Sequence, residues 1–129
     1  MISIGSVAAN RGDIAPIKGT IPTGATWDQY IPIVDEDGLR LDIDNYSFEL
    51  TFTDRDGNVD LRLGTASGEI LKTTDADGDT LRIFASPDDL GDLVGPYTCT
   101  FAAKLTTTSQ IWTLARGTVV FLEAPPAFA

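Results

Sequence analysis

The segment Tyr46–Leu63 alternates apolar and polar residues on both sides of one turn signal, and this pattern strongly limits how the chain can fold. Every second side chain falls on the same face, as expected for β-strands that turn one face towards a hydrophobic core. Between the two alternating stretches stands Asp56-Gly57, a dipeptide that tolerates the positive φ angles of a type I′ turn. The sequence therefore predicts a β-hairpin over this segment.

The spacing of the apolar residues fixes the expected register of the hairpin. A two-residue turn at Asp56 and Gly57 sets Phe52 opposite Leu61, so that both strands bury the same face. A loop one residue longer would set Phe52 against Asp60 and turn the apolar face of one strand to solvent. We therefore take Asp56 and Gly57 as structural turn residues.

Short alternating segments separated by turn signals cover much of the remaining chain. One helical signal interrupts them near residues 86–90, where Ser86 is a preferred N-cap and Pro87 suits the first helical position. In the last strand the apolar residues change phase across Gly117, which suggests a β-bulge. About seven to eight short strands without a long helix predict an all-β fold, an antiparallel β-sandwich.

Two of these segments carry more detailed expectations. Trp27 is in phase with Ile31 and is expected to anchor the core, while Pro32 cannot donate to a strand ladder and so favours an edge strand. The alternation of apolar and polar residues does not decide whether Ile70 or Leu71 is the inward residue of its strand.

A tyrosine two residues before the only cysteine gives a hint about topology. Tyr97 and Cys99 open a regularly alternating strand just after the helical turn. This arrangement resembles the tyrosine corner of immunoglobulin-like (Ig-like) domains and implies an Ig-like sandwich. Because the second cysteine of such domains is missing, no intrachain disulfide can form, and we expect Cys99 to be a small buried residue.

The composition argues against several classes of function. The 19 Asp and Glu against 9 Lys and Arg give a net charge of −10, which repels phosphate backbones, so we expect no nucleic-acid partner. Histidine is absent, which removes Ser-His-Asp catalysis and His-ligated metal sites. The run Val119–Leu122 is far too short to cross a membrane, and no signal peptide is visible after Met1. No catalytic motif or phosphate loop stands out, so the sequence predicts no enzyme and no cofactor.

Three Asp-rich turns, at residues 35–38, 54–57 and 75–79, raise the question of calcium binding. Their glycine falls at the fourth position instead of the sixth position of an EF-hand loop, and strands instead of helices flank them. Hairpin turns explain all three, so the sequence predicts no metal site. Should a cation bind, the candidate ligands are Asp75, Asp77 and Asp79.

The length of 129 residues fits one domain that can bury its own core. We expect an N-terminal arm or edge segment, a sandwich domain and a Pro-rich tail, at residues 1–25, 26–123 and 124–129. Pro125, Pro126 and Phe128 are candidate assembly contacts, because a stiff segment that ends in an apolar side chain can order against a neighbouring copy.

A series of turns and strand ends over about residues 11–122 resembles a known family. The series comprises Gly12-Asp13, Gly24-Ala25-Thr26-Trp27, Asp35–Gly38, Phe48-Glu49-Leu50, Ser67-Gly68-Glu69-Ile70, Leu93–Tyr97 and Leu114–Val119. In this order the features are similar to those of small Ig-like β-sandwich proteins of tailed-bacteriophage virions, which include tail, baseplate and head-accessory modules. The resemblance implies a non-enzymatic structural subunit, located in the virion, whose partners are other virion proteins and copies of itself.

A different function is also open from the residues themselves. A carbohydrate- or surface-binding β-sandwich would use an exposed aromatic side chain, either Tyr30 or Trp112, to stack on a sugar ring. The two functions differ in what they require of the surface. An assembly subunit buries apolar edges against its neighbours, whereas a lectin-like module leaves an aromatic platform open.

Overall fold

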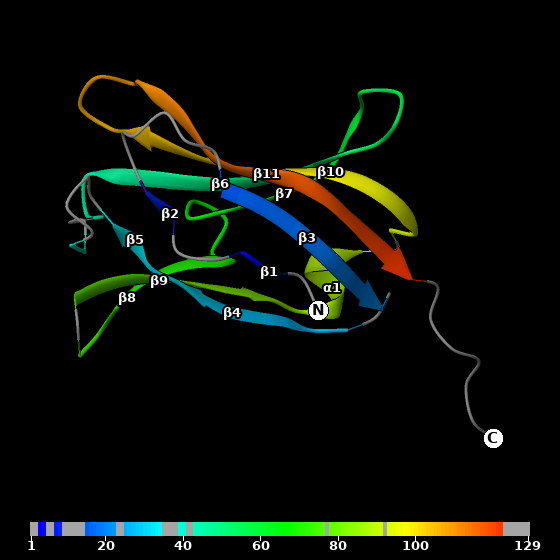
Figure 1. The fold of residues 1–129 in the computed structure, drawn as a ribbon, viewed down its shortest axis with the longest axis horizontal. Coiled ribbons are helices and arrows are strands. Elements are labelled where there is room, and N and C mark those ends of the chain that lie inside the picture. The colour runs from blue at the N-terminus through cyan, green and yellow to red at the C-terminus, as the bar shows by residue number, and fades with distance from the viewer. Residues whose placement is uncertain are drawn as a thin grey trace.

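The computed structural model describes residues 3–4, 7–8, 15–22, 25–34, 39–40, 43–76, 78–91 and 93–122. These residues form strands in two layers with one short helix at the end of the molecule where the last strand finishes (Figure 1). In chain order the elements are β1 (Ser3–Ile4), β2 (Val7–Ala8), β3 (Ala15–Pro22), β4 (Trp27–Ile31), β5 (Ile33–Val34), β6 (Tyr46–Thr53), β7 (Val59–Gly64), β8 (Ile70–Asp75), β9 (Gly78–Ala85), α1 (Pro87–Leu90), β10 (Gly95–Leu105) and β11 (Ile111–Leu122).

The two layers have the strand order of an Ig-like sandwich. The larger sheet has six strands in the order β1-β3-β11-β10-β6-β7, and the smaller has the order β4-β9-β8. If β4, β9 and β8 are taken as strands B, E and D, then β6, β10 and β11 are C, F and G, and β7 extends their sheet as C′ does. Two pairs, β3 with β11 and β2 with β5, are parallel, and the other pairs are antiparallel. The predicted antiparallel sandwich is therefore confirmed apart from these two parallel pairs.

The core lies between the sheets and is built from the inward residues of both. Trp27 of β4 meets Phe52 of β6 edge-on across the two layers, with ring centroids 6.4 Å apart, and both side chains are fully buried. Trp27 is thus the core anchor that its phase predicts, and β4 is an edge strand. Ile70, rather than Leu71, is the inward residue of β8. Cys99 is buried, and this burial raises the pKa of its thiol to about 12.

The β6–β7 hairpin has the predicted register but not the predicted turn. Phe52 pairs with Leu61, as expected. The loop is nevertheless one residue longer than a type I′ turn, because the amide of Asp54 donates to the carbonyl of Asn58 at 2.9 Å and closes the loop around three residues. Gly57, at φ 87°, takes the left-handed conformation that such a loop needs at its third position.

A β-bulge absorbs the extra loop residue. Thr53 pairs with Val59, while Phe52 pairs with Leu61, so Asp60 has no cross-strand partner in the ladder. The bulge restores the register that a longer loop alone would have lost. It also turns Val59 to solvent, although its alternation with Leu61 predicts an inward side chain.

The phase change in β11 exists, but it does not lie at Gly117. Phe101 pairs with Ala115 and the next residue, Ala102, pairs with Thr113, which leaves Leu114 as the extra residue of the bulge. The prediction of a bulge at Gly117 is therefore wrong in its position. Leu114 and the next residue, Ala115, are both buried, so the inward phase of β11 changes at this pair.

Gly117 instead permits close contact between the parallel strands β3 and β11. It pairs with Ile17, and a Cβ atom added to Gly117 would overlap the Ile17 carbonyl group. Ile17 and Ile21 of β3 are buried in the common core. Residues 15–22 therefore belong to the sandwich, which begins before the expected boundary at residue 26. The predicted tail, with Pro125, Pro126 and Phe128, lies outside the described residues.

The helical turn near residues 86–90 is confirmed as α1. The Ser86 hydroxyl accepts from the Asp89 amide at 3.2 Å, and the Asp89 carboxylate accepts from the Ser86 amide at 2.9 Å, which forms a capping box. Leu90 is buried, and Gly91 ends the helix at φ 67°. This short element carries the chain from the smaller sheet into β10 of the larger one.

We predict that Gly117→Ala destabilises the fold by about 3 kcal/mol, because overpacking against backbone atoms leaves little room for adjustment. Gly57→Ala is the control, since no atom lies within 4 Å of the added Cβ and only the positive φ opposes the substitution. We expect that control to cost about 1 kcal/mol. Urea unfolding of both variants measures the difference, and a Gly117→Ala variant as stable as the wild type would contradict the close approach of β3.

Candidate functional site

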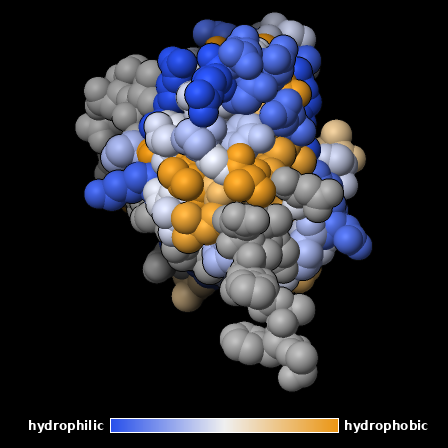
Figure 2. All heavy atoms as spheres, turned by 90° about the vertical axis from the view of Figure 1, so that its right-hand side faces the viewer, coloured by the Kyte–Doolittle hydropathy of each residue, from blue (hydrophilic) through white to orange (hydrophobic). Residues whose placement is uncertain are grey.

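The outer face of the larger sheet carries an uncharged apolar surface where β3, β11 and β10 come together. We call this surface the terminal patch; it comprises Pro22, Val94, Pro96, Val120 and Leu122. The register places Leu122 beside Pro22 and Val120 beside Pro96. Val94 and Leu122 are the most open members, with 54% and 46% of their surface exposed. Figure 2, which views this end of the molecule, shows apolar side chains gathered next to strongly polar ones.

Local sequence determines which residues of the terminal patch face outward. Val119 and Phe121 are buried, so their neighbours in β11, Val120 and Leu122, point away from the core. The residue before Gly95, Val94, continues this outward face beyond the first residue of β10, because Gly95 pairs with Phe121. Sequence reasoning missed the surface, since it depends on the parallel pairing of β3 with β11, which no local pattern reveals.

Tyr97 lies beneath this end of the sheet. Its side chain reaches from β10 towards the bulge of the β6–β7 hairpin. Its ring packs edge-on against Phe121, with centroids 5.6 Å apart. The carboxylate of Asp60, the unpaired bulge residue, interacts electrostatically with its hydroxyl. Burial, and then the interaction with Asp60, raise the pKa of Tyr97. In a tyrosine corner the hydroxyl bonds to backbone a few residues upstream, so the Asp60 contact differs from that motif.

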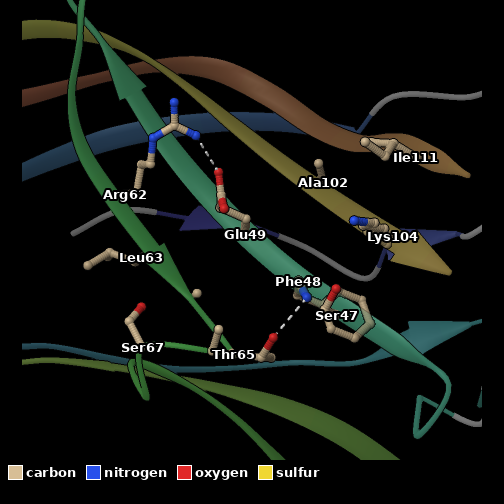
Figure 3. A pocket seen from close by; sticks show the side chains of 13 residues that line it. Ser47, Phe48, Glu49, Arg62, Leu63, Thr65, Ser67, Ala102, Lys104 and Ile111 are labelled. Carbon is tan, nitrogen blue, oxygen red and sulfur yellow. Dashed lines mark hydrogen bonds and ion pairs between the residues drawn. The ribbon is translucent and has the colours of Figure 1, made fainter. Parts of the chain in front are cut away.

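A shallow groove of about 600 Å³ lies at the opposite end of the same outer face (Figure 3). Outward side chains of four neighbouring strands line it, among them Glu49, Arg62, Ala102, Lys104 and Ile111. Arg62 Nη1 lies 2.9 Å from Glu49 Oε1, so the only carboxylate of the lining is already paired. The groove offers an apolar floor with a satisfied ion pair, which suits an apolar side chain better than acid–base chemistry.

The smaller sheet carries an exposed aromatic surface on its own outer face. Tyr30 of β4 and Phe84 of β9 lie on either side of the Arg82 guanidinium, at 5.5 and 4.9 Å from ring centroid to Cζ. Asp28 accepts two hydrogen bonds from the same guanidinium. We call this set the aromatic platform. Of the two aromatic candidates from the sequence, Tyr30 is open, whereas Trp112 is half-buried against Tyr46, with centroids 6.0 Å apart.

The candidate calcium ligands divide between described and undescribed residues. Asp75 forms an ion pair with Arg40 at 3.0 Å, and the Asp79 carbonyl accepts from the same guanidinium at 3.1 Å. Asp77 lies outside the described residues. Over the part of the chain that the structure describes, no group of three or more His, Cys, Asp or Glu side chains is placed to hold a metal ion.

No helix in the described ranges is long and apolar enough to cross a membrane. Comparison with known proteins assigns no family to the chain: no protein-family model matches it, and a search of curated proteins finds no significant match. The candidate sites therefore stand on their geometry alone.

We predict that stability falls less steeply with rising pH in Tyr97→Phe than in the wild type, because the substitution removes a phenol whose pKa is raised in the folded state. Because the pKa of Tyr97 is higher in the folded state, the unfolded chain loses this proton first, and stability falls as pH rises above about 10. Chemical unfolding at pH 7 to 11 tests this effect, with Tyr30→Phe, which removes an exposed hydroxyl, as the control. Identical pH profiles for wild type and Tyr97→Phe would contradict the raised pKa of Tyr97.

Proposed function

We propose that the protein is a non-enzymatic structural subunit of a tailed-phage particle, located in the virion and held there by contacts with other virion proteins and copies of itself. The observation that carries this proposal is the terminal patch. An exposed apolar surface with a polar surround is typical of protein–protein interaction sites. The resemblance of the turns and strand ends to Ig-like virion proteins supports the same function.

The charge of the chain makes an uncharged contact surface important. Copies that each carry −10 repel one another, and this repulsion opposes close packing in an assembly. The terminal patch contains no ionisable side chain, so two surfaces can meet there without desolvating a charge. Removal of Val94 and Leu122 from water supplies the favourable free energy.

The rigidity of the patch also suits a subunit interface. Four of its five residues lie in strands of the six-stranded sheet, and Pro22 and Pro96 have fixed φ angles. Little conformational entropy is therefore lost when a partner binds. The candidate contacts Pro125, Pro126 and Phe128 follow Leu122 closely in sequence, and we propose that they extend the same interface.

We predict that the double variant Val94→Asp/Leu122→Asp is incorporated into particles at least about tenfold less than wild type, because two buried charges in an interface cost well above 1.4 kcal/mol. Tagged variants are supplied during particle production, and mass spectrometry counts their copies in purified particles. Val59→Asp is the control, since Val59 is 42% exposed and belongs neither to the terminal patch nor to the lining of the groove.

Thermal unfolding of the three proteins in isolation establishes that the substitutions leave the fold intact. Incorporation of the double variant at the wild-type level would exclude the terminal patch as the contact surface. Absence of the wild-type protein from purified particles would overturn the proposed function itself.

A further inference from the structure

The aromatic platform is arranged around one guanidinium group. In the β4–β9 pairing, Tyr30 stands opposite Arg82, and Asp28 stands opposite Phe84. Arg82 therefore reaches diagonally to Asp28, and its Nε and Nη2 donate to the two carboxylate oxygens at 2.9 and 2.8 Å. The two rings flank the same guanidinium at cation–π distance. Four side chains from two neighbouring strands thus form one connected cluster.

The cluster holds its polar groups in place while leaving them accessible. The bidentate pair fixes both the carboxylate and the guanidinium, and the flanking rings restrain the long Arg82 side chain. The side chains of Arg82 and Asp28 nevertheless remain 33% and 41% exposed. Tyr30 and Phe84 expose 58% and 41% of their surface on the same side of the sheet. A ligand would therefore meet apolar ring surface beside a fixed acceptor and a fixed donor, at little entropic cost.

We propose that the aromatic platform, formed by Asp28, Tyr30, Arg82 and Phe84, is a binding site for a neutral saccharide. The C–H face of a pyranose ring is apolar and packs on an aromatic side chain. The hydroxyls at the rim of the sugar need a donor and an acceptor together, which Arg82 and Asp28 supply side by side. The site goes beyond the assembly function, because it lies on the other sheet from the terminal patch.

Charge selects a neutral sugar over an anionic one. The Arg82 and Asp28 charges cancel within the platform, and the chain as a whole carries −10. An anionic polysaccharide would have to compete with Asp28 for Arg82 while being repelled by the rest of the surface. A neutral sugar meets neither obstacle.

Native electrophoresis of the full chain through gels that contain a dissolved polysaccharide tests this site. The probes are four neutral polymers, a β-glucan, an α-mannan, a galactomannan and dextran, with polygalacturonate as the anionic comparison and serum albumin as the mobility reference. We expect at least one neutral polymer, and not polygalacturonate, to retard the protein. Tyr30→Ala should weaken the apparent affinity at least about tenfold, as should Arg82→Met, which keeps much of the side-chain volume but removes the donor.

Matched variants separate the stacking contact from the fold. Tyr30→Phe keeps the ring and should retain most of the retardation, and Ile111→Ala, on the other sheet, should behave as wild type. Thermal unfolding verifies that each variant is folded. No retardation by any neutral polymer, equal retardation of wild type and Tyr30→Ala, or retardation by polygalacturonate alone would overturn the proposal. Loss of particle incorporation in Tyr30→Ala without loss of polysaccharide binding would assign the platform to a protein partner instead. These results are independent of those for Val94 and Leu122.

Discussion

The burial of Phe52 is the interaction on which the rest of the structure depends. Its ring contacts Trp27 of the opposite sheet and Phe121 of its own sheet, with centroids 6.4 and 5.5 Å away. It lies in β6, the strand that joins the β10–β11 hairpin to β7. A shift of β6 by one residue would turn this ring to solvent and remove both contacts. The register of the β6–β7 hairpin is therefore constrained by the core more strongly than by its own turn.

This constraint explains why the hairpin contains a bulge. The five residues from Asp54 to Asn58 form a hydrogen-bonded loop that is one residue too long for the register required by Phe52. Asp60 absorbs the difference, and its carboxylate contributes to the raised pKa of Tyr97. The residue that the ladder leaves unpaired thus interacts with a side chain of β10, next to the strand ends that carry the terminal patch. The local irregularity of the hairpin therefore follows from the long-range packing of the core.

The hairpin and its bulge also show which features of the fold the sequence can predict and which it cannot. Strand periodicity, the capped turn at Ser86 and the inward position of Trp27 were all predictable, because each depends on residues a few positions apart. The loop length at Gly57 and the bulge at Leu114 could not be predicted, because both depend on the register that a neighbouring strand imposes. The parallel pairing of β3 with β11 joins residues about a hundred positions apart, and the only local trace of it is the missing side chain of Gly117. The terminal patch shares that origin and was missed, whereas Tyr30 of the aromatic platform was identified by its phase in a single strand.

The two outer faces differ in a way that bears on the two functions we propose for them. On the larger sheet the terminal patch has no charge, and contact there depends on removing apolar surface from water. On the smaller sheet the platform keeps a paired carboxylate and guanidinium within reach of solvent, which an apolar protein surface would have to desolvate at a cost. A subunit that packs through the first face leaves the second one exposed. The sandwich thereby separates an uncharged apolar surface, which we propose for assembly, from a polar, aromatic surface, which we propose for a hydrated ligand.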